Sequence, residues 1–306
     1  MSHVLLVHEI VKHFGKVRAV DGVSFEVRHG TITGLLGRNG AGKTTALRMI
    51  NGIFLPDSGT VEILGASSCA PVRDRIGYLP EERGLYKQMK VLEQLLFLAE
   101  IKGRKPKATK AAAEKWLVRF ELWDKRDTKL IELSKGNAQK VQLIGALLHD
   151  PELVILDEPM SGLDPVNVVL VRQLLSEMKA HGKTVLLSTH MMGEAEKLAD
   201  DIVLIHDGKV VVSGSLPDIR AAHGKNTVHL DFEGDGAFLS SLEGVERAVV
   251  TNSSAEVALG RGVDAQDVLR SVVGRLRIRR FEVASPTLEQ IFIESVGAET
   301  LAEAAS

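Results

Sequence analysis

Short apolar runs bounded by turn-forming residues recur through the first two thirds of the chain. They include VSFEV, ITGLLG, LVILDEP and TVLLSTH, and helical patterns lie between several of them. Short apolar strands that alternate with helices are typical of a largely parallel sheet that is covered on both faces. The pattern therefore predicts an α/β fold with a mixed, largely parallel sheet.

Two stretches depart from this alternation. Between about residues 85 and 135, apolar positions follow helical spacing and the other positions are charged, as in GRKPKATKAAAEKW. We interpret this stretch as a helical subdomain inserted between sheet elements. The later stretch DIVLIHDGKVVVSGS holds two β-rich runs joined by Asp207-Gly208. An Asp-Gly pair between such runs predicts a β-hairpin.

A second domain is predicted after the linker-like segment AAHGKN. The expected elements are strand 227–232, helix 236–242, strand 245–251, strand 254–259, helix 264–273, strand 276–283 and a last helix from Pro286. This βαββαβ order suits a small α+β module of the ferredoxin-like kind. We therefore expect a first domain over residues 1–222, an accessory domain over 226–297 and a tail over 298–306.

Composition narrows the function classes. Lys plus Arg (38) nearly balances Asp plus Glu (40), so the net charge predicts no nucleic-acid partner. The basic run RLRIRR alternates with apolar residues, as a strand with one solvated face does. The single cysteine, Cys69, cannot form an internal disulfide, which suits a reducing cytoplasm. No apolar run has the length of a signal peptide or a membrane span, so we expect a soluble chain that another protein holds at any membrane.

The segment GLLGRNGAGKTT contains a complete phosphate-binding loop, with the pattern Gly37-x-x-x-x-Gly42-Lys43-Thr44 between a strand and a helix. In such a loop backbone N–H groups surround the phosphates, the lysine reaches the β and γ phosphates and the threonine hydroxyl binds Mg²⁺. A glycine-rich turn that binds nothing is the alternative, and the intact pattern in this context disfavours it. The segment predicts a nucleoside triphosphate with Mg²⁺.

Three more candidates follow predicted strands. Asp157 suits the Mg²⁺ shell, and Glu158, expected to point the other way from the strand, suits the polarisation of a water that attacks the γ-phosphate. His190 ends another strand, where it either orients that water or has only a structural role. His8 and His13 in HEIVKH are five residues apart and would not share a helix face, so we assign them no metal site.

The ordered set of the phosphate-binding loop, LSKGNAQK (133–140), LDEP, SGLD (161–164) and STH resembles an ATP-binding cassette (ABC) ATPase over about residues 4–220. GTPases carry an Asn-Lys-x-Asp motif, which is missing here, and P-loop kinases lack the second of these motifs. The resemblance implies that two cassettes pair head to tail, as a homodimer or a heterodimer. The signature LSKGN of one chain would then close over the ATP of the other.

The resemblance also implies the ligands. ATP and Mg²⁺ are the expected cofactors, with Thr44, Asp157 and Glu81 at the metal, and Glu158, His190 and Glu81 at the hydrolysis step. Ser134 and Gly136 would contact the γ-phosphate on the partner, and Asp164 would lie at the dimer interface. The full set of expected nucleotide-binding residues is Phe14, Gly37, Asn39, Gly40, Gly42, Lys43, Thr44, Thr45, Ser134, Gly136 and Asp164.

The sequence departs from the family pattern at three places. Lys135 and Asn137 replace a glycine and a glutamine of the usual Leu-Ser-Gly-Gly-Gln signature, and we expect activity to survive. Glu81, or Glu82 if the register slips by one, stands where a glutamine is usual. A glutamate can still bind Mg²⁺, but its charge raises the electrostatic cost of a nearby γ-phosphate. Phe14 stands where an aromatic ring stacks on adenine, although it could also pack against its own strand end.

The forms LPEERGLY and LSKGN, with the C-terminal SPTLEQIFIESVG, resemble bacterial export cassettes of the sodium-extrusion and drug-resistance kind. This implies an ATP-hydrolysing exporter subunit, cytoplasmic and held at the inner face of the cell membrane by a separate permease. The permease is expected to dock near the loop after Glu81, at Arg83, Tyr86, Lys87 and Met89. The alternative is a soluble ABC ATPase that acts as a nucleotide-gated clamp on ribosomes or nucleic acid. Such proteins usually carry two cassettes or long coiled coils, and this chain carries neither.

Overall fold

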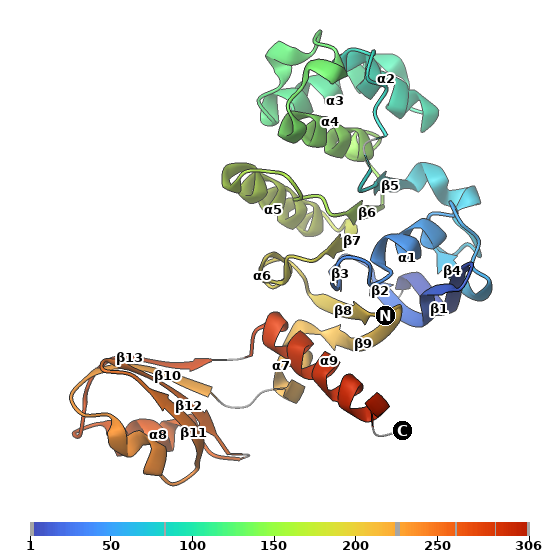
Figure 1. Cartoon of the computed structure of the whole chain (residues 1–306). Coiled ribbons are helices and arrows are strands. Elements are labelled where there is room, and N and C mark those ends of the chain that lie inside the picture. The colour runs from blue at the N-terminus through green and yellow to red at the C-terminus, as the bar shows by residue number, and fades with distance from the viewer. Residues whose placement is uncertain (1–2, 83, 224–226, 261, 285, 305–306) are drawn as a thin grey trace. The chain divides into compact units, whose positions relative to one another are not determined.

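The chain divides into two compact units, Met1–Ser215 and Leu216–Ser306, in a computed structural model (Figure 1). The structure describes residues 3–82, 84–223, 227–260, 262–284 and 286–304. Each unit has its own hydrophobic core. The units are therefore described one at a time.

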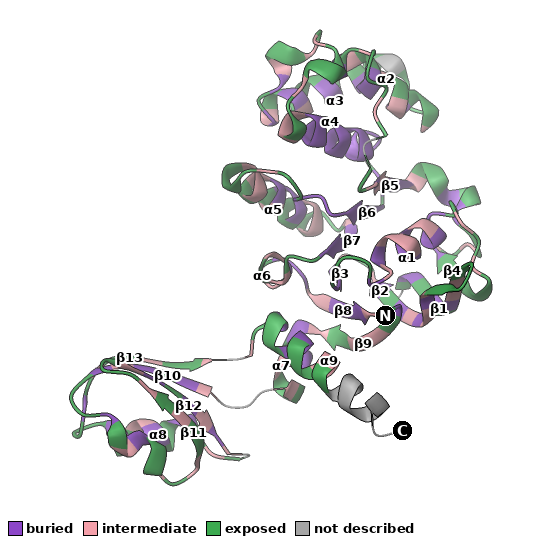
Figure 2. Cartoon of the chain, in the orientation of Figure 1, coloured by how far each residue is buried: buried purple, intermediate pink, exposed green. Residues whose placement is uncertain are grey.

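A six-stranded sheet forms the centre of the first unit. Its order is β5-β6-β7-β3-β8-β9, and all neighbours are parallel except β8 and β9. The strands are β3 (Ile32–Leu36), β5 (Ile76–Leu79), β6 (Leu153–Asp157), β7 (Thr184–Thr189), β8 (Asp201–His206) and β9 (Lys209–Ser215). Every residue of β3, β6 and β7 is buried, as expected for strands covered on both faces (Figure 2). The predicted α/β fold class is confirmed.

A separate antiparallel sheet of order β2-β1-β4 lies beside the central one. Its strands are β1 (His3–Phe14), β2 (Val17–Arg28) and β4 (Ser58–Ile63). The run VSFEV belongs to β2 and not to the parallel sheet, so that part of the prediction was wrong. In β2 the residues Val23, Phe25 and Val27 are buried and alternate with more exposed ones, which is typical of a sheet with one solvated face.

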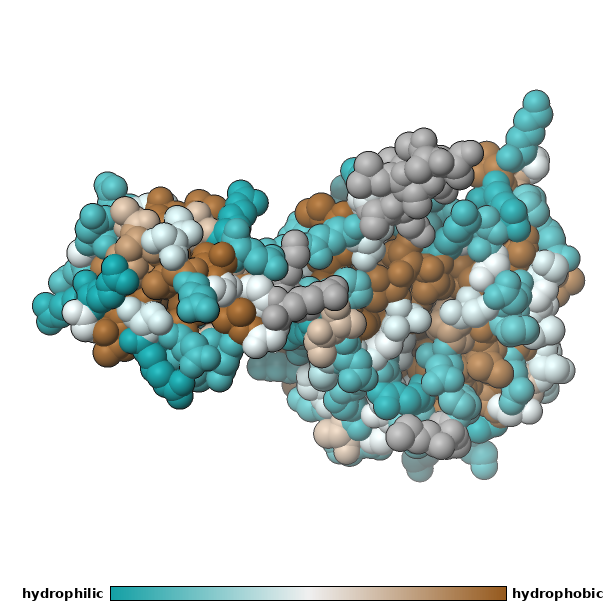
Figure 3. All heavy atoms as spheres, turned by 90° about the horizontal axis from the view of Figure 1, so that it is seen from below, coloured by the Kyte–Doolittle hydropathy of each residue, from teal (hydrophilic) through white to brown (hydrophobic). Residues whose placement is uncertain are grey.

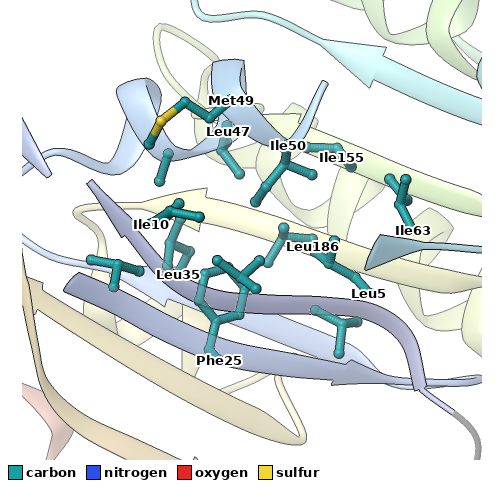
Figure 4. Packing of buried hydrophobic residues seen from close by; sticks show 14 of the residues in the cluster. Leu5, Ile10, Phe25, Leu35, Leu47, Met49, Ile50, Ile63, Ile155 and Leu186 are labelled. Atoms are coloured by element: carbon teal, nitrogen blue, oxygen red, sulfur yellow. The ribbon is translucent and has the colours of Figure 1, made fainter. Parts of the chain in front are cut away.

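The main core lies between the two sheets of the first unit. Helix α1 (Lys43–Ile50) contributes Leu47 and Ile50, the antiparallel sheet contributes Leu5 and Phe25, and the central sheet contributes residues such as Leu186 (Figure 4). This packing places the first turn of α1 at the carboxyl end of β3. Burial of this kind contributes about 25 cal/mol for each Å² of apolar surface removed from water.

Helices follow β5, as the periodicity predicted. They are α2 (Val91–Ile101), α3 (Pro106–Arg119) and α4 (Lys135–Leu147), with 3₁₀ turns at Trp123–Lys125 and Leu130–Glu132; a further 3₁₀ helix, Ala70–Arg75, precedes β5. Helix α4 is buried from residue 138 to residue 147 (Figure 2). A Cβ on Gly145 would lie 2.7 Å from Cδ1 of Leu98, so a larger residue there would require the Leu98 side chain to move. Helices α5 (Pro165–Ala180) and α6 (Met192–Ala195) complete this part of the unit.

The predicted hairpin at Asp207-Gly208 is confirmed. Strands β8 and β9 pair antiparallel, with His206 opposite Lys209. Asp207 and Gly208 have φ values of 44° and 79°. Positive φ at both central residues matches a type I′ turn, whose twist suits a two-residue hairpin.

The second unit contains a four-stranded antiparallel sheet of order β11-β12-β10-β13. Its elements are α7 (Leu216–His223), β10 (Thr227–Glu233), β11 (Val245–Val250), β12 (Ser254–Leu259), α8 (Ala265–Val272), β13 (Arg277–Ala284) and α9 (Leu288–Ala304). This is the strand order of a ferredoxin-like sheet. The helix expected over 236–242 is only a 3₁₀ turn, Ala237–Ser241, too short for a cooperative α-helix.

The basic run of the second unit lies mainly on strand β13. Arg277 and Arg279 are exposed and both pair with Glu233, while Arg280 pairs with Glu282. Hydrophilic and hydrophobic residues are interspersed on the face of the molecule shown in Figure 3. The strand with a solvated face predicted for this run is confirmed.

His149 makes the stability of the first unit dependent on pH. Its side chain is 1% exposed, and Nε2 lies 3.0 Å from the Ile76 carbonyl oxygen. Burial, supported by Lys102 and Arg104, lowers the pKa of His149 from 6.5 to about 4. The unfolded chain therefore binds a proton more readily, so this contribution to stability is complete above about pH 6.5 and is lost as the pH falls toward 4. Because one pKa unit corresponds to about 1.4 kcal/mol, the full loss is about 3 kcal/mol.

We expect His149→Gln, which keeps a donor for the Ile76 carbonyl, to flatten this pH dependence. Urea unfolding of the parent and the variant at pH 7 and pH 4.5 measures it. The parent should lose more free energy of unfolding between these pH values than the variant does. Equal losses in the two proteins would show that His149 is not responsible.

Candidate nucleotide-binding and hydrolysis site

The phosphate-binding loop connects β3 to α1. Gly42 has φ 104°, and a Cβ there would lie 2.4 Å from the Ala19 carbonyl oxygen, so only glycine fits. Helix α1 begins at Lys43 with no side-chain cap and no acidic residue in its first turn. Its first N–H groups are therefore free to bind an anion. A pocket of about 190 Å³ adjoins the loop and is lined by Ala19, Asn39, Gly40, Gly42, Lys43, Thr44, Thr45, Glu81 and Glu158.

Lys43 is held in place from both sides of this pocket. Its ammonium group donates to the carbonyl oxygens of Gly37 (2.8 Å) and Arg38 (3.1 Å). It also lies 3.7 Å from Oε1 of Glu158, and both side chains are almost fully buried. The lysine is therefore oriented for a phosphate by the same loop whose N–H groups would surround it.

Asp157 ends β6 and is fully buried. The Ser188 hydroxyl donates to Oδ1, whereas Oδ2 has no hydrogen-bond partner among the described residues. Burial raises the pKa of Asp157, the hydroxyls of Ser188 and Thr44 oppose that rise, and the negative charges of Glu81 and Glu158 add to it. A buried carboxylate oxygen without a partner is costly, and a divalent cation would satisfy it. The site therefore fits Mg²⁺.

Protein ligands alone do not complete such a metal site. Within the described ranges, no group of three or more His, Cys, Asp or Glu side chains is arranged to hold a metal ion. Mg²⁺ is usually held by one or two carboxylates together with substrate phosphates and water. The arrangement at Thr44 and Asp157 thus fits an ion that enters with a nucleotide.

The structure places Glu81, and not Glu82, at the pocket. The Thr44 hydroxyl donates to Oε2 of Glu81 at 3.4 Å. Glu82 instead forms an ion pair with Arg48, with Nη2 and Oε1 3.0 Å apart. Glu81 therefore lies at the Thr44 hydroxyl, while Glu158 lies at the Lys43 ammonium.

The backbone conformation at Glu158 differs from the extended strand that the sequence predicted. Strand β6 ends at Asp157, and Glu158 has φ 49°, so the chain turns out of the strand there. The expectation that strand alternation separates the two acids was therefore wrong. The Glu158 carboxylate accepts hydrogen bonds from the His190 backbone N–H (3.0 Å), from the Thr189 hydroxyl (3.3 Å) and from Nδ1 of His190 (2.8 Å). Because a carboxylate only accepts, His190 carries a proton on Nδ1.

His190 also lines a second pocket next to the loop. This pocket has a volume of about 550 Å³ and is lined by Gly37, Arg38, Asn39, Gly40, Ala41, His190, Met192, His206 and Asp207. Sequence reasoning missed the last two residues as pocket residues, although it identified their hairpin. The Gly208 N–H donates to the Ala41 carbonyl oxygen (3.0 Å), and this contact brings the hairpin to the loop.

The remaining candidates lie outside these two pockets. Ser134 caps α4 and accepts from the Asn137 N–H at 3.3 Å, and Gly136 lies in the same first turn. Asp164 caps α5, and hydrogen bonds from Asn167 lower the pKa of its carboxyl group. The Phe14 ring is 45% exposed, and its centroid is 5.7 Å from that of Phe54. An exposed ring is available to stack on a nucleobase, since packing at the strand end does not bury it.

Two family models match the chain. The model described as ABC transporter matches residues 20–161, and the model described as ATP-binding protein DrrA1-3-like, C-terminal domain, matches residues 214–296. The uncharacterized ABC transporter ATP-binding protein YhaQ of Bacillus subtilis is 41% identical over 96% of this chain and 99% of that protein. The Nod factor export ATP-binding protein I of Burkholderia orbicola is 33% identical over 95% of this chain and 96% of that protein.

Solved structures agree with the fold. The structure of an ATP-binding subunit of an ABC transporter matches with a TM-score of 0.67 and 33% identity, over 72% of this chain and 92% of that one. A dimeric bacterial ABC transporter cassette matches with a TM-score of 0.65 and 24% identity, over 69% of this chain and 98% of that one. The first unit therefore has the fold of these cassettes.

Proposed function

The chain belongs to the ATP-binding subunits of ABC transporters, and we propose that it powers export through a separate membrane-spanning permease. Proteins of this family are ATPases, so the chain binds and hydrolyses ATP. The observation that carries the direction of transport is its likeness, over nearly the whole chain, to a Nod factor export ATP-binding protein. The C-terminal unit takes part in that likeness, because the match covers 95% of the chain.

The phosphates of ATP would lie on the loop from Gly37 to Gly42 and at the first turn of α1. Lys43 would exchange its bonds to the loop carbonyls for bonds to the β and γ phosphates. Thr44, Asp157 and Glu81 would hold Mg²⁺, which neutralises charge on the phosphates. Oδ2 of Asp157, which has no hydrogen-bond partner in the part of the chain that the structure describes, supports this assignment. Phe14 would stack on the adenine.

Glu158 is proposed as the base for hydrolysis. A water placed in line with the γ-phosphate would give a proton to the Glu158 carboxylate as the water oxygen attacks phosphorus. The bond between the γ-phosphorus and the oxygen that bridges it to the β-phosphate would break, and ADP would leave with that oxygen. His190 holds that carboxylate through Nδ1 and the backbone N–H, leaving Nε2 for the water or the γ-phosphate. Glu158 is buried beside Lys43, with Oε1 3.7 Å from the ammonium nitrogen, so the proposed base lies next to the lysine that would bind the phosphates.

The signature residues are proposed to act on a second cassette. Ser134 and Gly136 lie at the N-terminus of α4 and line neither pocket at the phosphate-binding loop of the same chain. A helix N-terminus favours an anion, so the γ-phosphate bound by the partner would complete this end of α4. Two ATP molecules would then lie at a head-to-tail interface, with Asp164 near it.

A docking site for the permease is proposed beside the loop after Glu81. Tyr86 is 57% exposed, and its ring packs edge-on against Phe97 with centroids 5.5 Å apart. A pocket of about 250 Å³ next to it has apolar walls that include Leu85, Leu98 and Ile101. Lys87 and Met89 follow in the chain, whereas Arg83 lies outside the described residues. Among the helices described, none is long and apolar enough to cross a bilayer.

The proposal predicts which protein co-purifies with the chain. The tagged parent, extracted gently from native membranes, should bring down a polytopic membrane protein. Tyr86→Ser should reduce that recovery several-fold, because it removes an exposed aromatic anchor of the interface. Val118→Ser, at a residue of α3 that is also 56% exposed, is the matched control and should recover as much as the parent.

Basal ATPase activity should be the same in all three proteins, because neither residue lies at the nucleotide site. Equal recovery with Tyr86→Ser would contradict the docking site. Recovery of ribosomes or nucleic acid without a membrane protein would contradict the export proposal and favour a nucleotide-gated clamp.

A further inference from the structure

One buried glutamine holds the turn that carries Glu81. The side-chain amide nitrogen of Gln142, on helix α4, donates to the carbonyl oxygens of Pro80 and Glu82, each at 3.1 Å. These two carbonyls stand on either side of Glu81. Because carbonyl oxygens only accept, the amide nitrogen has to face the turn, and the orientation of Gln142 is unambiguous.

Little else holds the backbone of this turn. As far as the structure describes the chain, residues 80–82 make no backbone hydrogen bonds outside the sheet. The Glu82 side chain pairs with Arg48, and the Glu81 side chain accepts from Thr44. The two hydrogen bonds from Gln142 therefore decide where the Glu81 backbone lies, and with it the distance of the carboxylate from Thr44.

Gln142 belongs to the same rigid helix as the signature. Ser134 caps helix α4, and Gly136 lies in its first turn. The helix is buried from residue 138 to residue 147. Helix α4 also packs closely on strand β5, one turn beyond Gln142. A Cβ on Gly77 of β5 would lie 2.3 Å from the carbonyl oxygen of Ala146 on α4. A continuous, tightly packed helix moves as a unit, so a displacement at Ser134 is carried to Gln142.

We propose that Gln142 is a positioning residue that holds Glu81 at the metal site and ties it to the signature end of α4. When Ser134 contacts the nucleotide bound by the partner, helix α4 then shifts the position of Glu81 relative to Thr44 in the same chain. This second step rests on the proposed head-to-tail dimer, whereas the first step needs only one chain. Each ATP site thereby influences the other through a single helix.

A packing role for Gln142 makes a different prediction. Its Oε1 is buried without a hydrogen-bond partner among the residues described, and the side chain is 6% exposed. If Gln142 served only to fill space, an apolar residue of similar shape would be neutral or stabilising and would leave metal binding unchanged. Methionine has that shape and lacks the amide donor.

The test compares Gln142→Met, Glu81→Ala and the double variant. Mn²⁺ binding in the presence of a non-hydrolysable ATP analogue is followed by electron paramagnetic resonance in the full chain. Gln142→Met should weaken Mn²⁺ binding about 10-fold, the lower end of what outer-shell changes cost. Glu81→Ala should weaken it at least as much, because it removes the carboxylate itself. The double variant should be no weaker than the weaker single one, because both changes remove the same contact. Unchanged Mn²⁺ affinity in Gln142→Met, or multiplied effects in the double variant, would overturn the positioning role.

The proposed connection between Gln142 and the signature is tested by a separate measurement, the cooperativity of ATP hydrolysis. The Hill coefficient for ATP hydrolysis should fall toward 1 in Gln142→Met, with the thermal midpoint kept. A Hill coefficient equal to that of the parent would overturn the tie. The Mn²⁺ measurement needs neither the dimer nor the permease, so a failure of the proposed function leaves the test of Gln142 intact.

Discussion

Glu158→Gln is expected to lower the turnover of ATP by roughly 10²- to 10⁴-fold while ATP still binds, because the variant loses its general base. A glutamine oxygen can still accept the hydrogen bonds that Glu158 accepts from His190. The neutral amide cannot take a proton from the attacking water. It also removes the negative charge 3.7 Å from the Lys43 ammonium, which leaves the lysine to the phosphates.

The variant should therefore accumulate with ATP bound in a closed dimer. Phosphate release measures kcat, and light scattering with and without ATP measures the dimer. Glu152→Gln is the matched control, because Glu152 is an exposed residue that pairs with Arg75 away from the pockets. It should turn over at the parent rate. A Glu158→Gln protein that hydrolyses ATP within about twofold of the parent would remove Glu158 from the role of base.

Lys43→Ala is expected to act on nucleotide binding itself. Hydrogen bonds to charged groups contribute about 1.5 to 3 kcal/mol each, so the loss of two phosphate contacts should weaken ATP binding by about 100-fold or more. The buried Glu158 would also lose its nearest cation. Titration of a fluorescent ATP analogue measures the affinity, and Lys183→Ala, which removes a surface partner of Asp150, serves as the control.

The two variants should differ in their response to ATP. Glu158→Gln should dimerise more readily than the parent as ATP is added, whereas Lys43→Ala should not dimerise at the same ATP concentration. If Lys43→Ala bound ATP within about threefold of the parent, the lysine would not contact the phosphates. The pair thus separates nucleotide binding from the chemical step.

Local sequence was sufficient to predict the residues that carry the proposed chemistry and much of the fold. The P-loop pattern predicted a loop between a strand and a helix, and the structure has β3 before the loop and α1 after it. The Asp207-Gly208 turn was predicted correctly because two adjacent residues decide its φ angles. VSFEV was misassigned because its length alone suggests a buried strand, while its alternation indicates an antiparallel sheet with one solvated face.

Other features depend on residues that are distant in the sequence, so local patterns could not predict them. Choosing between Glu81 and Glu82 required the positions of Thr44 and Arg48, which lie on α1 and are distant in sequence. The direction of Glu158 depends on a positive φ that strand periodicity does not predict. The bonds from Gln142 to Pro80 and Glu82 leave no pattern in either segment, since an amide can bond to any carbonyl within reach.

By itself, then, the sequence determined which groups are proposed to bind and hydrolyse a nucleotide, including Lys43, Thr44, Asp157 and Glu158, because short motifs set their own backbone frame. Only the tertiary structure decided how these groups face one another. It brings the ends of β3, β6 and β7 together, leaves Oδ2 of Asp157 without a partner among the described residues and connects the turn at Glu81 to the signature helix. The physical reason is that distances between residues far apart in sequence depend on the packing of whole elements, which no local pattern records.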